Sequence, residues 1–175
     1  MFLTFDTETT GLPKNFNAPV SESENWPRLV QLAWQLNDNN GRLISVNSHI
    51  IKPDGYSIPY NSEKIHGIST EIALKEGKKL GDILKEFEKD LLRSKYIIGH
   101  NIKFDINIVG AEHYRKNFKS SIEDKLKIDT AIISKSFCNL QGGLGGGLKM
   151  PKLIEMYESL FLSLIHISEP TRQSL

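Results

Sequence analysis

An Asp-x-Glu pair at the end of the first apolar run is the feature that most constrains how this chain can fold. Residues 1–5 (MFLTF) indicate a buried strand, Asp6 and Glu8 follow directly, and residues 11–13 (GLP) indicate a turn. Side chains two positions apart on a strand point to the same side, so both carboxylates are expected on one face. Such carboxylates repel unless a cation lies between them, and oxygen ligands suit Mg²⁺ or Mn²⁺. The pair predicts a metal site, although surface strands also carry such pairs by chance.

A second polar block follows another predicted strand near the middle of the chain. Residues 96–100 (YIIGH) indicate a short buried strand, and residues 101–105 (NIKFD) lead from it into an apolar helical stretch. Asn101 is the expected N-cap of that helix. Asp105 falls in its first turn, where the helix dipole favours an anion. Helix-start acidity alone would also account for Asp105, so a ligand role depends on the first carboxylate pair.

Hydrophobic periodicity predicts strands first and helices later. The Asn-Gly turn at 40–41 predicts a hairpin, so the chain is expected to begin with three antiparallel strands. Strands are expected at 1–6, 29–36, 42–52, 96–100 and 128–130, and helices within 62–76 and at 81–93 and 103–115. This order indicates an α/β fold with a mixed sheet covered by helices.

Length and composition are those of a soluble, single-domain protein. The chain has 175 residues, of which 39% are hydrophobic and 25% charged. No apolar run is long enough to span a membrane, and we expect no secretory signal because the chain opens on a strand without a basic segment. A single cysteine, Cys138, is expected to be a structural thiol and suits the reducing cytoplasm. We therefore expect a cytoplasmic protein without a membrane partner.

The formal net charge of +1 argues against a protein that wraps or slides along duplex nucleic acid. Such proteins usually carry a basic excess. A nearly neutral chain fits an enzyme that holds only a few nucleotides and in which metal ions supply much of the positive field.

Residues 5–13 (FDTETTGLP) and 100–105 (HNIKFD) together resemble two motifs of the DEDDh 3′–5′ exonucleases. The resemblance is strongest to the proofreading type, similar to the epsilon subunit of bacterial DNA polymerase III, and covers residues 1–161. It implies a ribonuclease H-like fold, in which a mixed five-stranded sheet (an antiparallel meander, then parallel strands) is flanked by helices. It also implies hydrolysis of nucleic acid from the 3′ end of a single strand, a role in DNA replication, and a DNA polymerase as a candidate partner.

The resemblance assigns chemistry to individual side chains. It implies that Asp6, Glu8 and Asp105 are catalytic and hold two Mg²⁺ or Mn²⁺ ions, the arrangement of two-metal hydrolysis. It places the terminal nucleotide against Thr7, Thr9, Gly11, Leu12, His66, Asn101 and Phe104. The alternative for His66 is a loop histidine whose hydrogen bonds are made within the protein. The alternative for Phe104 is a position in the hydrophobic core. Thr9 favours DNA over RNA as the substrate, because the oligoribonuclease branch typically carries Met there. For Asp129 we expect structural support rather than metal binding.

The chain departs from the family at its third motif, His-x-x-x-x-Asp, which should follow a helix resembling residues 151–161. His166 is present, but Thr171 stands where the fourth carboxylate is expected, and Pro170 would break a helix there. Residues 162–175 look like translated sequencing-adapter DNA, so we expect an exonuclease domain at 1–161 that is incomplete at its C-terminus. This chain is accordingly expected to be weakly active or inactive. The alternatives are a nucleic-acid-binding remnant of this fold, an oligoribonuclease-like RNA exonuclease, and a carboxylate-based metal-binding domain.

Overall fold

The computed structural model describes residues 1–142 and 146–162 of the chain. The chain divides into two compact units, Met1–Ile128 and Asp129–Leu175. The first unit carries both motifs found in the sequence, and the expected boundary between 161 and 162 lies in the second. Nearly all of the tail at 162–175, with His166 and Thr171, lies outside the described residues.

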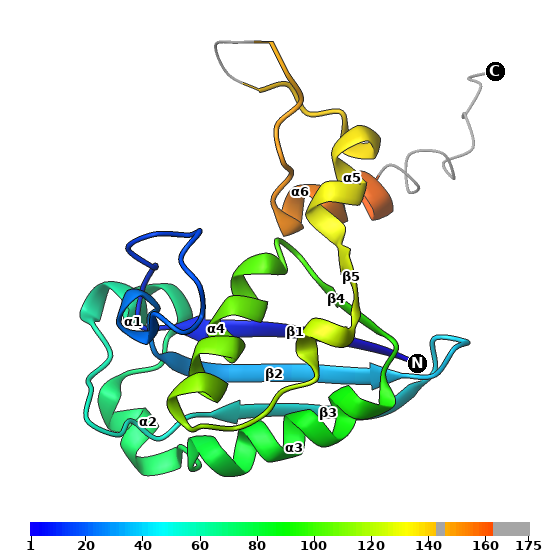
Figure 1. The fold of residues 1–175 in the computed structure, drawn as a ribbon. Coiled ribbons are helices and arrows are strands. Elements are labelled where there is room, and N and C mark those ends of the chain that lie inside the picture. Colours follow the sequence, from blue (N-terminus) through cyan, green and yellow to red (C-terminus); the bar gives the residue numbers. More distant parts are fainter. Residues whose placement is uncertain (143–145, 163–175) are drawn as a thin grey trace, which may run out of the picture. The chain divides into compact units, whose positions relative to one another are not determined.

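A five-stranded sheet in the order β3-β2-β1-β4-β5 organises the fold (Figure 1). The strands are β1 (Phe2–Thr9), β2 (Leu29–Asn37), β3 (Leu43–Ile50), β4 (Tyr96–Gly99) and β5 (Leu126–Asp129). β1 pairs antiparallel with β2, β2 pairs antiparallel with β3, and β1 pairs parallel with β4. The predicted meander and mixed α/β sheet are confirmed, with the first strand central.

β1 runs further than the sequence predicts. Its pairing with β2 continues to Thr9, opposite Leu29, with a register shift between Glu8 and Thr9. Both carboxylates of the first motif therefore lie within a hydrogen-bonded ladder rather than in a free turn. That ladder fixes the direction in which each side chain leaves the strand.

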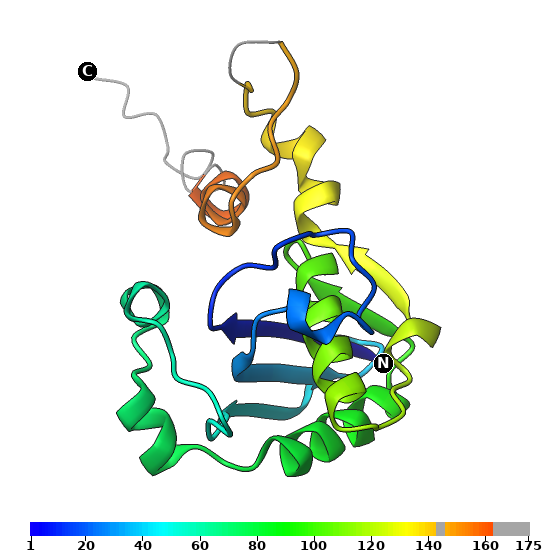
Figure 2. The same ribbon diagram turned by 60° about the vertical axis from the view of Figure 1, so that its left-hand side comes forward.

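Two helices cover one face of the sheet, α3 (Leu80–Arg93) and α4 (Lys103–Arg115) (Figures 1 and 2). The ring of Phe87 on α3 is fully buried and meets Phe5 of β1 and Trp34 of β2 edge-on, with centroids 5.3 and 5.5 Å apart. Aromatic pairs in this geometry add to the stabilisation gained from burial alone. The helix face predicted from Ile83, Leu84, Phe87 and Leu91 is the buried one.

The start of α4 differs from the prediction. Ile102, not Asn101, is the N-cap residue, and no side chain caps the helix. Asn101 has a φ of 61°, in the left-handed region that asparagine tolerates better than most residues. Its carbonyl accepts a hydrogen bond of 3.1 Å from the Phe104 N–H. Asn101 thus turns the chain into the helix through its backbone, and the N-cap prediction was wrong.

Two short helices follow β3, in the segment where helices within 62–76 were predicted. α1 (Tyr60–His66) ends at Gly67, whose φ of 77° is easy only for glycine at this C-cap. α2 (Thr70–Glu76) begins at Ser69, whose hydroxyl accepts from the Ile72 N–H. One-turn 3₁₀ helices cover Ser23–Asn25 and Ile122–Asp124. α1 begins two residues before the range 62–76 in which helices were expected.

The second unit contains α5 (Thr130–Cys138), α6 (Leu153–Tyr157) and a π-helical turn at Glu158–Leu162. The carboxylate of Asp129 accepts a hydrogen bond of 2.9 Å from the Ala131 N–H and caps α5, the structural role expected for it. Within 1–142 and 146–162, no helix is long and apolar enough to cross a membrane.

Candidate active site

The carboxylates of the first motif lie on one face of β1. Leu3, Phe5 and Thr7 are buried on the side covered by helices, so Asp6 and Glu8 project to the opposite side. Asp6 is exposed and Glu8 is half-buried. The period of two in the sequence thus predicts their orientation correctly.

Asp105 reaches the same strand from the first turn of α4. Its Oδ1 accepts a hydrogen bond of 2.6 Å from the Thr7 hydroxyl and one of 3.0 Å from the Thr7 N–H. Only 3% of Asp105 is exposed, so this anchor is shielded from water. Thr7 sits between Asp6 and Glu8 in sequence, and its bond to Asp105 brings the two predicted motifs together at one strand.

Burial shifts the ionisation of all three carboxyl groups, and the charge of Asp6 affects the other two. Burial, followed by the charge of Asp6, raises the pKa of Asp105 to about 7, although the Thr7 hydrogen bonds oppose this. Loss of water and then the Asp6 charge also raise the pKa of Glu8. Partial loss of water raises the pKa of Asp6, opposed by the Thr7 N–H and the charge of His100. Loss of water is the main cause of all three raised pKa values, and the negative charge of Asp6 adds to it at Glu8 and Asp105.

The donor set fits a hard divalent cation by its chemistry, because it consists of carboxylate oxygens that repel one another. Among 1–142 and 146–162, however, no three His, Cys, Asp or Glu side chains are arranged as a group that could hold a metal ion. One oxygen of Asp105 is turned to Thr7 instead. The ligand types are therefore present at β1 and α4, while the coordination geometry is not assembled.

His66 lies close enough to Glu8 for its charge to lower the pKa of that carboxyl. When the ring is neutral, its Nδ1 accepts a hydrogen bond of 3.1 Å from the Ile68 N–H and the ring proton is on Nε2. Nε2 is buried and has no hydrogen-bond partner among the described residues. A buried donor without a partner beside the carboxylates is a position that a substrate oxygen could satisfy.

The other predicted substrate contacts lie along the segment that leaves β1 and at the start of α4. The Thr9 hydroxyl donates 2.7 Å to the Gly11 carbonyl, and Gly11 has a φ of 149° that disfavours other residues. Leu12 is 75% exposed, so its side chain is available for an apolar contact. Asn101 is exposed, and Phe104 is half-buried against the core, which matches its alternative assignment as a core residue.

Sequence reasoning missed the aromatic neighbour of Phe104. Phe16 is 52% exposed, and its ring centroid lies 6.5 Å from that of Phe104. The loop holding Phe16 is closed by two hydrogen bonds between Asn15 and Asn25, of 2.7 and 2.9 Å. Phe104 is the residue before Asp105, so Phe16 lies near the candidate site. No pattern in the sequence indicates this proximity.

A buried ionic network fixes the other end of that loop. Glu112 of α4 is fully buried, and its Oε1 lies 2.9 Å from Arg28 Nε, 3.0 Å from Arg115 Nη1 and 3.0 Å from the Leu29 N–H. Arg28 also stacks over Tyr56, 4.3 Å from the ring centroid. Glu112 falls on the apolar face of the 103–115 helix, and a charged residue at such a position is a sequence signal for a buried ion pair. The network joins the start of β2 to the helix that carries Asp105.

Comparison with protein families identifies the chain's relatives. The model of the RNase_T family, described as exonuclease, matches residues 3–162. The 3′-5′ exonuclease DinG of Bacillus subtilis (strain 168) is 29% identical over 134 residues, which are 77% of this chain and 13% of that protein. The chain thus spans only a small part of this relative.

Solved structures share the fold. Escherichia coli Exonuclease I in complex with a dA16 oligonucleotide superposes with a TM-score of 0.69 at 19% identity, covering 90% of this chain and 35% of that one. A product-bound structure of exonuclease I gives a TM-score of 0.63 at 22% identity, covering 79% and 32%. At these identities the likeness establishes the ribonuclease H-like fold.

Proposed function

Because the chain belongs to the RNase_T exonuclease family, we propose that it is the nuclease domain of a 3′–5′ exonuclease acting on single-stranded DNA. The observation that carries the proposal is the hydrogen bond from Thr7 to Asp105, which joins the second motif to the strand bearing Asp6 and Glu8. Family membership places the domain among the phosphodiester hydrolases. The activity of this chain, its polarity and its substrate are the parts that need a test.

Asp6, Glu8 and Asp105 are the residues that would hold two Mg²⁺ or Mn²⁺ ions, which activate water and offset charge on the phosphate when bound. The chain itself supplies the orientation of these ligands. The β1–β2 ladder fixes Asp6 and Glu8, and the two Thr7 donors fix Asp105. Asp105 would have to offer its second oxygen, or rotate from Thr7, to act as a ligand.

DNA is the proposed substrate, and its 3′ end would lie along the loop that follows β1. Exonuclease I, which shares the fold, was solved with dA16, a single-stranded DNA. The unpartnered Nε2 of His66 would donate to a substrate oxygen beside Glu8. Phe16, packed near Phe104, would stack on an unpaired base, a contact that tolerates any sequence. A polymerase partner, a role in replication and a cytoplasmic location stay predictions.

A second function, nucleic-acid binding without turnover, is favoured by one feature of the sequence. Thr171 stands five residues after His166, where the family's third motif has an aspartate. A hydroxyl cannot replace a carboxylate as a charged ligand, and loss of a positioned base alone costs about 10²–10⁴-fold in rate. We therefore expect residues 1–175 to bind a 3′ end but to degrade it negligibly.

The test uses a 5′-labelled single-stranded DNA and the same strand as RNA. Binding is measured in Ca²⁺ and degradation in Mg²⁺, Mn²⁺ or EDTA. The proposal expects the chain to bind DNA more tightly than RNA. It expects a strand with a free 3′-hydroxyl to bind more tightly than a strand whose two ends are blocked. It expects negligible turnover of either. Grafting a C-terminal helix with His and Asp at family spacing should produce metal-dependent 3′–5′ shortening.

The matched control is Asp6→Asn in the grafted protein, which keeps the strand and removes one ligand charge. Shortening that persists in Asp6→Asn would remove Asp6 from the site. If the wild-type chain binds no single strand in Ca²⁺, the domain is a metal-binding module and the nuclease proposal fails. Preference for RNA would move it to the oligoribonuclease-like alternative.

A further inference from the structure

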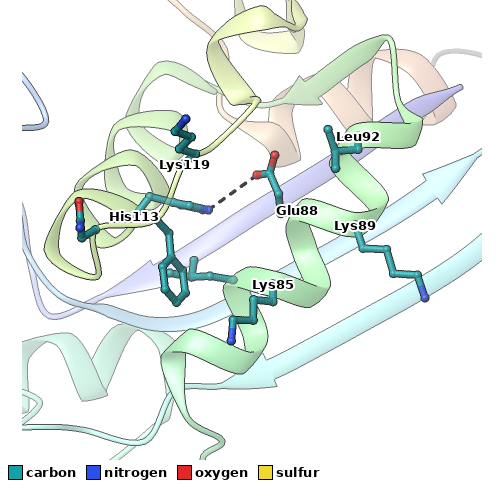
Figure 3. Close-up of a pocket in the computed structure, with 9 residues that line it drawn as sticks. Lys85, Glu88, Lys89, Leu92, His113 and Lys119 are labelled. Carbon is teal, nitrogen blue, oxygen red and sulfur yellow. Dashed lines mark ion pairs between the residues drawn. The ribbon is translucent and has the colours of Figure 1, made fainter.

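A second candidate site lies on the helix-covered side of the first unit, between α3 and the segment that follows α4. A pocket of about 460 Å³ opens there, lined by Leu84, Lys85, Glu88, Lys89, Leu92, His113, Asn117, Phe118 and Lys119 (Figure 3). Its volume is within the range of ligand pockets in proteins. None of these residues belongs to the carboxylate site on β1.

The rim of the pocket is basic and its floor is apolar. Lys85, Lys89 and Lys119 are exposed, and Figure 3 shows them spread around the opening, with Lys119 and Lys85 on opposite sides. Neither Lys89 nor Lys119 forms an ion pair with any of the residues described here. Three lysines against one glutamate leave the pocket with two excess positive charges, compared with +1 for the whole chain. The lining of this opening therefore carries a local excess of positive charge.

The apolar floor remains partly open to solvent. Leu84 is fully buried, Phe118 is half-buried, and Leu92 is 64% exposed although it is an aliphatic side chain on a well-packed helix. The Lys85 ammonium lies 5.5 Å from the centroid of the Phe118 ring. The pocket therefore offers apolar packing on Leu92 and Phe118 together with ion pairing to the lysines of its rim.

The one acidic side chain in the pocket is used to build it. Glu88 accepts 2.8 Å from the Ser121 N–H and 3.1 Å from the Ser120 hydroxyl, and its Oε2 lies 3.7 Å from His113 Nε2 (Figure 3). His113 is buried, and its other ring nitrogen contacts the Val109 carbonyl. These bonds fix the loop after α4 against α3. A pocket held in this way is formed before a ligand arrives, which reduces the entropy lost on binding.

We propose that this pocket is a docking site for an acidic peptide segment of a partner protein, one that carries an apolar side chain among its carboxylates. The carboxylates would pair with Lys89 and Lys119, and the apolar side chain would cover Leu92 and the edge of Phe118. A nucleic-acid strand fits less well, because the face of Phe118 on which a base would stack is already covered by Lys85. The site is separate from the nuclease face and does not depend on its chemistry.

The probe is a fluorescein-labelled hexapeptide, Glu-Glu-Leu-Phe-Glu-Glu, measured by fluorescence polarisation at low and at high salt with the full chain. We expect saturable binding that weakens with salt. The double variant Lys89→Glu with Lys119→Glu should bind at least about tenfold more weakly. The matched control, Lys75→Glu with Lys78→Glu, reverses two exposed lysines outside the pocket and should bind as the wild type does. Lys85 is left in place so that its contact with Phe118 is kept.

Two further measurements separate this site from plain charge attraction. Leu92→Ser leaves the charges unchanged, so it should still weaken binding of the probe, whereas a peptide with Ala for Leu and Phe should bind weakly to every variant. Melting curves check that the variants are folded. Equal affinity for the two double variants, no effect of Leu92→Ser, or displacement of the peptide by an oligothymidylate would overturn the proposal.

Discussion

The hydroxyl of Thr7 donates a hydrogen bond of 2.6 Å to Oδ1 of Asp105, a residue 98 positions further along the chain. This contact links the central strand to the first turn of α4, and both groups are buried. The orientation of Asp105, a candidate metal ligand, therefore depends on Thr7, whose side chain lies on the face of β1 opposite Asp6 and Glu8.

Thr7→Val should loosen Asp105 without emptying space in the core, because valine keeps the shape of threonine and loses only the hydroxyl. The backbone N–H of residue 7 would still hold the carboxylate, so we expect a loss of about 1–2 kcal/mol in the free energy of unfolding. Urea unfolding at neutral pH measures it. Thr4→Val, at an exposed position of the same strand, should change stability by less than about 0.5 kcal/mol. Equal losses in the two variants would show that the hydroxyl bond is not stabilising.

The metal-free domain should become less stable as pH rises from about 4 through 7. The pKa of Asp105 is about 7 in the folded chain, compared with an ordinary value of 3.8, so the folded state holds the proton more tightly. The contribution of this group is therefore complete below about pH 4 and is lost as pH rises through the folded value. Unfolding in EDTA at several pH values measures the slope, and Asp105→Asn should flatten it. An unchanged slope in Asp105→Asn would assign the titration to another group.

Glu112→Gln should be strongly destabilising, by about 3–5 kcal/mol, because it leaves two arginines beside a neutral buried side chain. The loss should appear in urea unfolding as a lower midpoint. Glu123→Gln is the matched control, since Glu123 forms a surface pair of 2.6 Å with Lys127 and is 69% exposed. Such a pair contributes about 0–1 kcal/mol. Similar midpoints for the two variants would mean that the network is not a structural anchor.

Phe16→Ala should weaken the binding of single-stranded DNA while leaving the fold intact. Stacking of a base on an aromatic ring is worth about 1–3 kcal/mol, which predicts roughly a tenfold loss of affinity in Ca²⁺. The ring is half exposed and its loop is held by Asn15 and Asn25, so the melting temperature should hardly move. Val46→Ala, at an exposed position of β3, serves as control. Unchanged affinity in Phe16→Ala would exclude a stacking role.

The sequence was sufficient for the parts of the site that depend on local geometry. Alternation along β1 predicts that Asp6 and Glu8 share a face, and helix periodicity predicts Asp105 in the first turn of α4. The three-stranded antiparallel start follows from the Asn-Gly turn and three apolar runs. Each of these depends on residues only a few positions apart.

What the sequence could not supply depends on contacts between distant segments. The Thr7–Asp105 bond spans 98 positions and the Glu112–Arg28 contact spans 84, so both form only when α4 packs against the sheet, which no local pattern specifies. The N-cap prediction at Asn101 failed because its favoured left-handed conformation competes with its capping role. The raised pKa of Asp105 likewise follows from burial, which appears only once the fold is formed.

The most direct test of the central account is calorimetric titration of the chain with Mn²⁺. We predict binding of about one ion through Asp6, Glu8 and Asp105, with a weak second event because the fourth carboxylate of the motif is absent. Asp6→Asn should lower the affinity at least about tenfold, since it removes a ligand charge. Glu71→Gln, an exposed acid on α2, should leave the isotherm unchanged. Wild-type binding in Asp6→Asn, or no binding at all by the chain, would contradict a metal-dependent nuclease site at β1 and α4.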